Sequence, residues 1–138
     1  MPDDEMLILD THALIWLVEG SKPLGRRAAR LADDARAREQ LAVAAISFWE
    51  TAMLARAQRI TLDLPPGEWR LRVIGLGVQE IPLTGDVAIA AAMLPDFHAD
   101  PADRLIVASA QAMDAGLITA DDRILRWRGP LVRHDARK

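Results

Sequence analysis

The sequence predicts an α/β fold, a three-layer α/β/α sandwich around a central, mostly parallel sheet of about five short strands. Short apolar runs that suit buried strands alternate along the chain with longer segments of helical periodicity. Such alternation needs crossover connections, which place helices on both faces of a parallel sheet. With 138 residues, the chain fits a single domain, which we expect to span residues 1–138.

The expected strands are short apolar runs, at residues 6–9, 41–46, 78–83, 117–119 and 131–132. The run from 41 to 46 is apolar at every position, which is typical of a strand covered on both faces. Pro82 limits the pairing of the third strand, because proline has no amide hydrogen to donate.

The expected helices lie between these strands, at residues 12–18, 24–39, 47–57, 68–74, 85–94, 100–115 and 122–127. Their ends carry recognisable signals. Gly20 closes the first helix, Pro23 precedes the second, and Ser47 opens the third with the spacing of a capping box. Thr84 caps the fifth helix, and Gly116 is the expected stop of the sixth.

The composition restricts where the protein acts. No stretch approaches the roughly 18 continuous apolar residues of a membrane span, and the acidic residues 1–5 lack the basic start of an export signal. The chain has no cysteine, which excludes disulfides and thiolate metal sites. We therefore expect a cytoplasmic protein without a membrane partner.

The net charge argues against a protein that coats nucleic acid by bulk electrostatics, but it does not exclude a nuclease. A formal charge of −3 argues against binding nucleic acid by overall charge alone. A cluster of carboxylates, however, becomes locally positive once it has bound divalent cations. Fifteen arginines stand against two lysines, and arginine forks suit phosphate. The same arginines also suit the solvated faces of helices.

Four acidic residues follow expected strands or begin the next helix: Asp10, Glu50, Asp103 and Asp121. Because the carboxyl ends of parallel strands meet at one edge of a sheet, these acids should converge there. Neighbouring ionised carboxylates repel unless a cation neutralises them. Oxygen ligands without thiolates or paired histidines suit Mg²⁺ or Mn²⁺.

Helix capping is the alternative role for each of these acids. Glu50 completes the capping box of Ser47, and Asp10 and Asp121 each stand where a cap is expected. Asp103 is different, because Asp100 already supplies the cap ahead of Pro101. From the residues alone, a metal site and a set of helix caps both remain open.

Four sequence blocks occur in order along the chain, at residues 7–16 (LILDTHALIW), 47–50 (SFWE), 98–108 (HADPADRLIVA) and 117–122 (LITADD). Together they resemble PIN-domain nucleases, in particular the VapC-type toxins of prokaryotic toxin–antitoxin systems. The resemblance implies a PIN-like fold and a metal-dependent endoribonuclease. RNA phosphodiesters would be hydrolysed by a Mg²⁺-activated water, and Mn²⁺ would substitute for Mg²⁺. It also implies a VapB-like antitoxin partner and a homodimer.

The resemblance assigns roles to individual residues. Asp10, Glu50, Asp103 and Asp121 would be the catalytic and metal-binding acids. The residues that would support them or contact the substrate are Thr11, Asp100, Arg104, Thr119 and Asp122. Among these, Thr11 and Thr119 would supply hydroxyls. Arg104 would contact phosphate or form an ion pair that fixes a carboxylate.

Three histidines and a basic C-terminal segment lie outside this assignment. His12, His98 and His134 lack the spacing of a zinc pair, so we expect structural or surface roles for them. The basic C-terminal segment with arginines at 123, 126, 128 and 133 is expected to guide RNA or to be solvated. The alternative functions are a PIN-family RNA-processing nuclease without an antitoxin, and an inert acidic-site α/β binding domain. A receiver domain is disfavoured because no lysine lies beside the acids.

Overall fold

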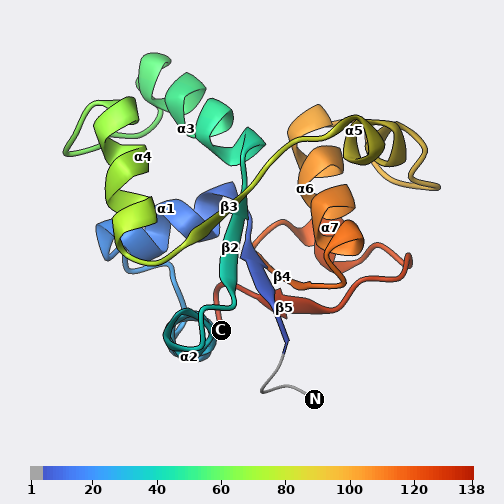
Figure 1. The fold of residues 1–138 in the computed structure, drawn as a ribbon, viewed down its shortest axis with the longest axis horizontal. Helices are drawn as coiled ribbons and strands as arrows, with labels where there is room; N and C mark the ends of the chain where they lie inside the picture. The colour runs from blue at the N-terminus through green and yellow to red at the C-terminus, as the bar shows by residue number, and fades with distance from the viewer. Residues whose placement is uncertain (1–4) are drawn as a thin grey trace.

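The structure is a computed structural model, and it describes residues 5–138. Its centre is a five-stranded, fully parallel sheet with the strand order β3-β2-β1-β4-β5 (Figure 1). The strands are β1 (Leu7–Leu9), β2 (Leu41–Ala44), β3 (Gln79–Ile81), β4 (Gly116–Thr119) and β5 (Arg133–Asp135). The predicted parallel sheet of five strands is confirmed.

Helices cover both faces of this sheet, as the sandwich prediction requires. Those in residues 5–138 are α1 (Thr11–Glu19), α2 (Arg26–Ala37), α3 (Ile46–Arg56), α4 (Pro66–Gly75), α5 (Gly85–Ala92), α6 (Pro101–Ala112) and α7 (Asp122–Leu125). None of them is long and apolar enough to cross a membrane. The acidic start of the chain, residues 1–4, lies outside the described residues.

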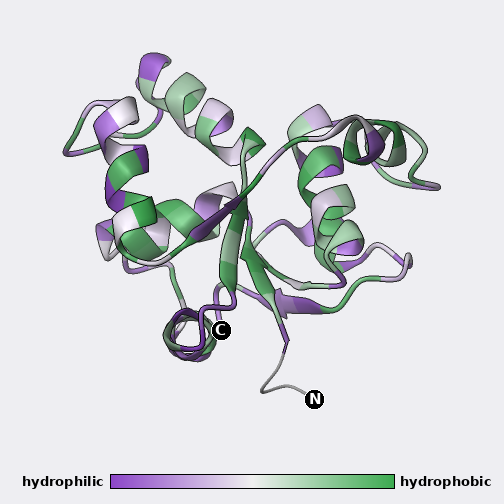
Figure 2. Cartoon of the chain, viewed as in Figure 1, coloured by the Kyte–Doolittle hydropathy of each residue, from purple (hydrophilic) through white to green (hydrophobic). Residues whose placement is uncertain are grey.

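The core is divided between the two faces of the sheet. Leu7 and Leu9 of β1 pack with α1, α2 and α4, whereas Ile8 between them packs with α6 and α7 on the other face. Successive side chains of a strand point to opposite faces, so a central strand must be apolar at every position. Figure 2 shows this in the hydrophobic central strands and the hydrophilic edge strand β5.

The register of the central strands places the candidate site. Leu9 of β1 pairs with Val43 of β2 and with Ile118 of β4. Asp10 and Thr119 are the residues that follow Leu9 and Ile118, so both reach the same edge of the sheet at the same level. The predicted convergence of strand ends therefore occurs between β1 and β4.

Several predicted helix ends are confirmed. Gly20 ends α1 in the left-handed conformation, with φ 65°. Thr84 caps α5, because its hydroxyl oxygen accepts from the Val87 amide at 3.3 Å. Asp10, Asp100 and Asp121 likewise cap α1, α6 and α7.

Two other predicted helix signals were wrong. Helix α3 begins at Ile46 with Ala45 before it, so Ser47 lies inside the helix, and its buried hydroxyl accepts a hydrogen bond from Thr11. Helix α6 ends at Ala112, and Gly116 is instead the first residue of β4. A Cβ on Gly116 would meet the end of the Glu5 side chain, which would have to move aside.

The last strand was predicted at residues 131–132, but β5 comprises Arg133–Asp135. The apolar run was misleading because β5 is an edge strand, and its side chains are only partly buried. The position of β5 is set by its main-chain pairing with Leu117–Thr119 of β4, and not by an apolar pattern of side chains.

Candidate active site

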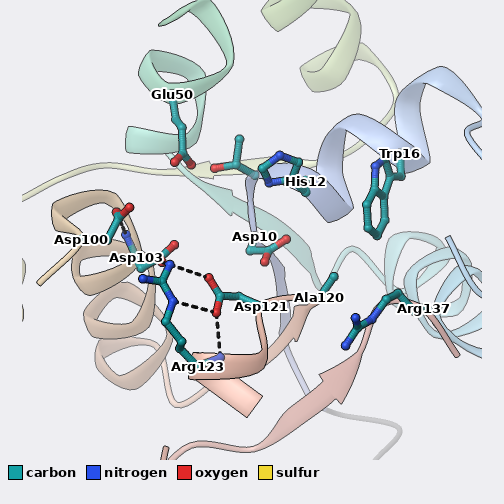
Figure 3. Close-up of a pocket in the computed structure, with 11 residues that line it drawn as sticks. Asp10, His12, Trp16, Glu50, Asp100, Asp103, Ala120, Asp121, Arg123 and Arg137 are labelled. Atoms are coloured by element: carbon teal, nitrogen blue, oxygen red, sulfur yellow. Dashed lines mark hydrogen bonds and ion pairs between the residues drawn. The ribbon is translucent and has the colours of Figure 1, made fainter. Parts of the chain in front are cut away.

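The carboxyl edge of the sheet opens into a pocket of about 370 Å³. Figure 3 shows its lining residues converging from both sides of the sheet edge. They are Asp10, Thr11, His12, Trp16, Glu50, Asp100, Asp103, Ala120, Asp121, Arg123 and Arg137. All four acids predicted as catalytic line this pocket, and Asp100 adds a fifth carboxylate.

Asp10 is the most buried of these acids, and both of its carboxylate oxygens are bound. Oδ1 accepts from the Ala13 amide at 2.9 Å, and Oδ2 accepts from the Thr119 hydroxyl at 2.5 Å. Burial raises the pKa of Asp10, although these two hydrogen bonds oppose the rise. Asp10 can therefore cap α1 through Oδ1 and still face the pocket, because Thr119 holds the other oxygen, Oδ2.

Asp103, in the first turn of α6, faces His98. The Nε2 atom of His98 lies 2.7 Å from Asp103 Oδ2. Burial raises the pKa of Asp103 to about 6, and the carboxylates of Asp100 and Asp121 add to the rise. This carboxyl therefore changes its charge close to neutral pH.

Asp121 follows β4 and is held by Arg123. Its Oδ1 accepts from the Arg123 amide at 2.8 Å, and its Oδ2 accepts from the Arg123 guanidinium at 3.1 Å. Burial alone would raise the pKa of Asp121, but the hydrogen bonds from Arg123 lower it below the ordinary value. Asp103 and Asp121 are thus neighbouring carboxyls with opposite pKa shifts.

One group of side chains in the described residues has the geometry to hold a metal ion. His98, Asp103 and Asp121 each offer a ligand atom, and these atoms lie within 4.8 Å of one another. Figure 3 shows Glu50 and Asp10 facing the same pocket from α3 and the end of β1. The group contains two of the four predicted acids, Asp103 and Asp121, and adds His98, whereas Asp10 and Glu50 are not part of it.

The neighbouring acids Asp100 and Asp122 lie in different environments. Asp100 lines the pocket and its Oδ1 accepts from the Asp103 amide at 3.1 Å. The Asp122 side chain is 61% exposed and pairs with Arg137 at 2.8 Å, outside the pocket lining. The geometry favours Asp121 over Asp122 as a site residue.

Two of the expected supporting residues have contacts that differ from their predicted roles. The Thr11 hydroxyl donates to Ser47 at 3.0 Å, which joins α1 to α3 and does not reach a carboxylate. The Arg104 guanidinium donates to main-chain oxygens of residues 91–98, including His98 at 2.9 Å and Phe97 at 2.7 Å. Arg104 therefore fixes the connection that carries His98. Of its two expected roles, the ion pair with a carboxylate does not occur within residues 5–138, and the phosphate contact stays a prediction.

Sequence reasoning missed the roles of two residues near the acids. His98 was expected to be structural or on the surface, yet it contacts Asp103. Its ring stacks on Phe97 with ring centroids 4.3 Å apart, which fixes its orientation. Arg123 was considered only as part of a basic segment, yet it reaches both Asp121 and Asp103. The position of His98 five residues before Asp103 was the available signal.

Comparison with known proteins identifies the family of the chain and agrees with its fold. A family model for the PIN domain matches residues 7–129. The chain belongs to the PIN domain family. A curated relative of this PIN domain, Ribonuclease VapC22 of Mycobacterium tuberculosis (strain ATCC 25618 / H37Rv), is 38% identical over 125 residues, which is 90% of this chain and 93% of that protein.

Solved structures share the fold of this PIN domain. A toxin–antitoxin complex from Klebsiella pneumoniae superposes with a TM-score of 0.58 at 24% identity, over 91% of this chain and 95% of that one. VapBC2 from Rickettsia felis, bound to a DNA fragment from its promoter, gives a TM-score of 0.63 at 13% identity, over 94% and 97%. At these identities the superpositions establish the fold, and the assemblies are properties of those proteins.

Proposed function

We propose that this PIN domain is a metal-dependent endoribonuclease and the toxin of a VapBC-type toxin–antitoxin pair. The observation that carries the proposal is the charge of the pocket. Five carboxylates line it against two guanidinium groups, those of Arg123 and Arg137. An RNA phosphate would be repelled from such a pocket unless a cation offset the carboxylates.

The donor set fits Mg²⁺, with Mn²⁺ as a substitute. Asp103 and Asp121 would hold the ion together with Asp10 and Glu50, directly or through water, because carboxylate oxygens are the preferred ligands of both cations. The nearby imidazole of His98 is compatible with Mn²⁺. When bound, the divalent cation would supply a Lewis acid that activates water and neutralises charge on the phosphate.

The chain's own residues would prepare the pocket for this chemistry. Thr119 and the first turn of α1 hold Asp10 in one orientation. His98 orients the Asp103 carboxylate, because its Nε2 atom lies 2.7 Å from Asp103 Oδ2. The pocket hydroxyl of Thr11 is engaged with Ser47, so we propose water as the nucleophile and no covalent intermediate.

The toxin role rests on similarity to proteins of that kind. Ribonuclease VapC22 spans nearly the same length as this chain, and the fold is shared with toxin–antitoxin complexes. We propose a VapB-like antitoxin, a homodimer and a cytoplasmic location. The alternative is a PIN nuclease that processes RNA without an antitoxin. Co-purification with the product of the adjacent small reading frame distinguishes the two, since an RNA-processing enzyme would purify alone.

Cleavage of RNA by matched variants tests the nuclease proposal. With Mg²⁺, Asp10→Asn and Asp103→Asn should each lose activity by about a hundredfold or more. Asp122→Asn removes an equal charge next to Asp121 but outside the pocket lining, and it should retain most activity. EDTA should stop cleavage by the wild type. Full activity in EDTA, or an equal loss in all three variants, would contradict the mechanism.

A further inference from the structure

One of the two guanidinium groups that line the pocket, that of Arg123, contacts its carboxylates directly. The Arg123 guanidinium is 3.1 Å from Asp121 Oδ2 and 3.5 Å from Asp103 Oδ2, so it bridges the junction after β4 and the start of α6. Figure 3 shows it inserted beside Asp103 and bonded to Asp121. It therefore offsets part of the charge of two of the carboxylates that the proposed function assigns to the cation.

The positions of the guanidinium and of a cation overlap. The ligand atoms of Asp103 and Asp121 lie within 4.8 Å of each other, and the guanidinium contacts an oxygen of each. A divalent ion needs those oxygens at about 2.0–2.1 Å. Two positive charges at such separations repel strongly. The guanidinium and the ion therefore cannot both bind these two carboxylates closely.

The side chain of Arg123 can also move away from Asp103 and Asp121 without disturbing the start of α7. Its backbone amide, and not its side chain, supplies the 2.8 Å hydrogen bond that caps α7 through Asp121. The side chain itself is 55% exposed, so it can swing into solvent while the amide continues to hold Asp121. Anchoring and charge compensation are thus separate functions of one residue.

We propose that Arg123 is an internal counter-ion that occupies the cation position in the cation-free protein and competes with the divalent cation for Asp103 and Asp121. The proposal rests on the proposed function, since it concerns the same cation. The competing explanation is a structural ion pair that orients the two carboxylates for the metal. The two explanations predict opposite changes in cation affinity when the guanidinium is removed.

Mn²⁺ binding by the full chain, measured by titration calorimetry and by the loss of the free Mn²⁺ electron paramagnetic resonance signal, tests the proposal. Arg123→Ala should bind Mn²⁺ about two- to fivefold more tightly than the wild type, because an exposed ion pair of modest strength no longer competes. Arg123→Gln should behave in the same way while keeping the length of the side chain. Arg126→Ala is the matched control, since it removes an equal charge from the same segment and its guanidinium donates to the main-chain oxygen of Asp122.

Thermal unfolding gives a second readout that does not depend on activity. In EDTA, Arg123→Ala should unfold at a lower temperature than Arg126→Ala, because the carboxylates of Asp103 and Asp121 lose their counter-ion. Saturating Mn²⁺ should raise its unfolding temperature by more than it raises that of the wild type.

Three other results would contradict the counter-ion role of Arg123, and one of them would also contradict the metal-dependent function. Equal or weaker Mn²⁺ binding by Arg123→Ala would overturn the counter-ion role and leave the proposed nuclease intact. Equal tightening in Arg126→Ala would also overturn it, because general charge would then explain the effect. Absence of Mn²⁺ binding by the wild type and every variant would overturn both the counter-ion role and the metal-dependent function.

Discussion

Replacing Asp103 with asparagine should stabilise the metal-free protein and remove its response to Mg²⁺. The side chain of Asp103 is 14% exposed and lies near the carboxylates of Asp100 and Asp121. Its ionised form is therefore unfavourable in the folded protein, which raises its pKa from 3.8 to about 6. An amide of the same shape removes that charge.

The size of the effect follows from the pKa difference. The rise in the pKa of Asp103 from 3.8 to about 6 means that its ionised form costs the folded protein about 3 kcal/mol, at 1.36 kcal/mol per pKa unit. The substitution also weakens the contact with His98, so we expect Asp103→Asn to gain between about 1 and 3 kcal/mol at pH 7.5. Because the folded protein holds this proton more tightly than the unfolded chain, the carboxyl favours folding below pH 3.8, and this contribution is lost as the pH rises through about 6.

Urea unfolding, followed by tryptophan fluorescence in EDTA and in Mg²⁺, measures the effect. In EDTA, Asp103→Asn should unfold at higher urea than the wild type, with a smaller difference at pH 5 than at pH 7.5. In Mg²⁺ the wild type should gain stability by mass action, and the variant should gain little. Asp122→Asn, at a site 61% exposed, serves as the control for a surface carboxylate. Lower stability of Asp103→Asn in EDTA would refute the reasoning, because the ionised carboxylate would then be net stabilising.

Three further predictions concern the support of the site. Thr119→Val removes the donor to buried Asp10 Oδ2 and should cost about 1–3 kcal/mol in the free energy of unfolding by urea, most of which Thr119→Ser should restore. Arg104→Lys cannot reproduce the fork that binds the carbonyls of residues 91–98. It should lower the stability by roughly 1–3 kcal/mol and speed amide hydrogen exchange in that segment. Mn²⁺ affinity, followed by calorimetry, should fall by about tenfold per pH unit below pH 6, because protons then compete for Asp103; an affinity independent of pH would exclude this carboxyl as a ligand.

The sequence alone predicted the layered fold because the signals involved are local. A strand buried on both faces must be apolar throughout, and Leu41–Ala44 has that pattern. Caps such as Thr84 act on an amide three residues away, so they too are visible in the sequence. Local signals failed where a distant contact decided the structure. Ser47 resembled a cap but is used by Thr11, 36 residues away.

The candidate site shows the same division. Sequence order and the PIN-like blocks identified Asp10, Glu50, Asp103 and Asp121 as candidates, because each stands next to the end of a strand or the start of a helix. Only the tertiary structure placed Thr119 on Asp10 across 109 residues, and only it brought His98 and Arg123 to Asp103. The physical reason is range. Hydrophobic periodicity and helix caps depend on neighbours within about one helical turn, whereas contacts between side chains on separate elements depend on strand order and register, which are set by the packing of the whole core.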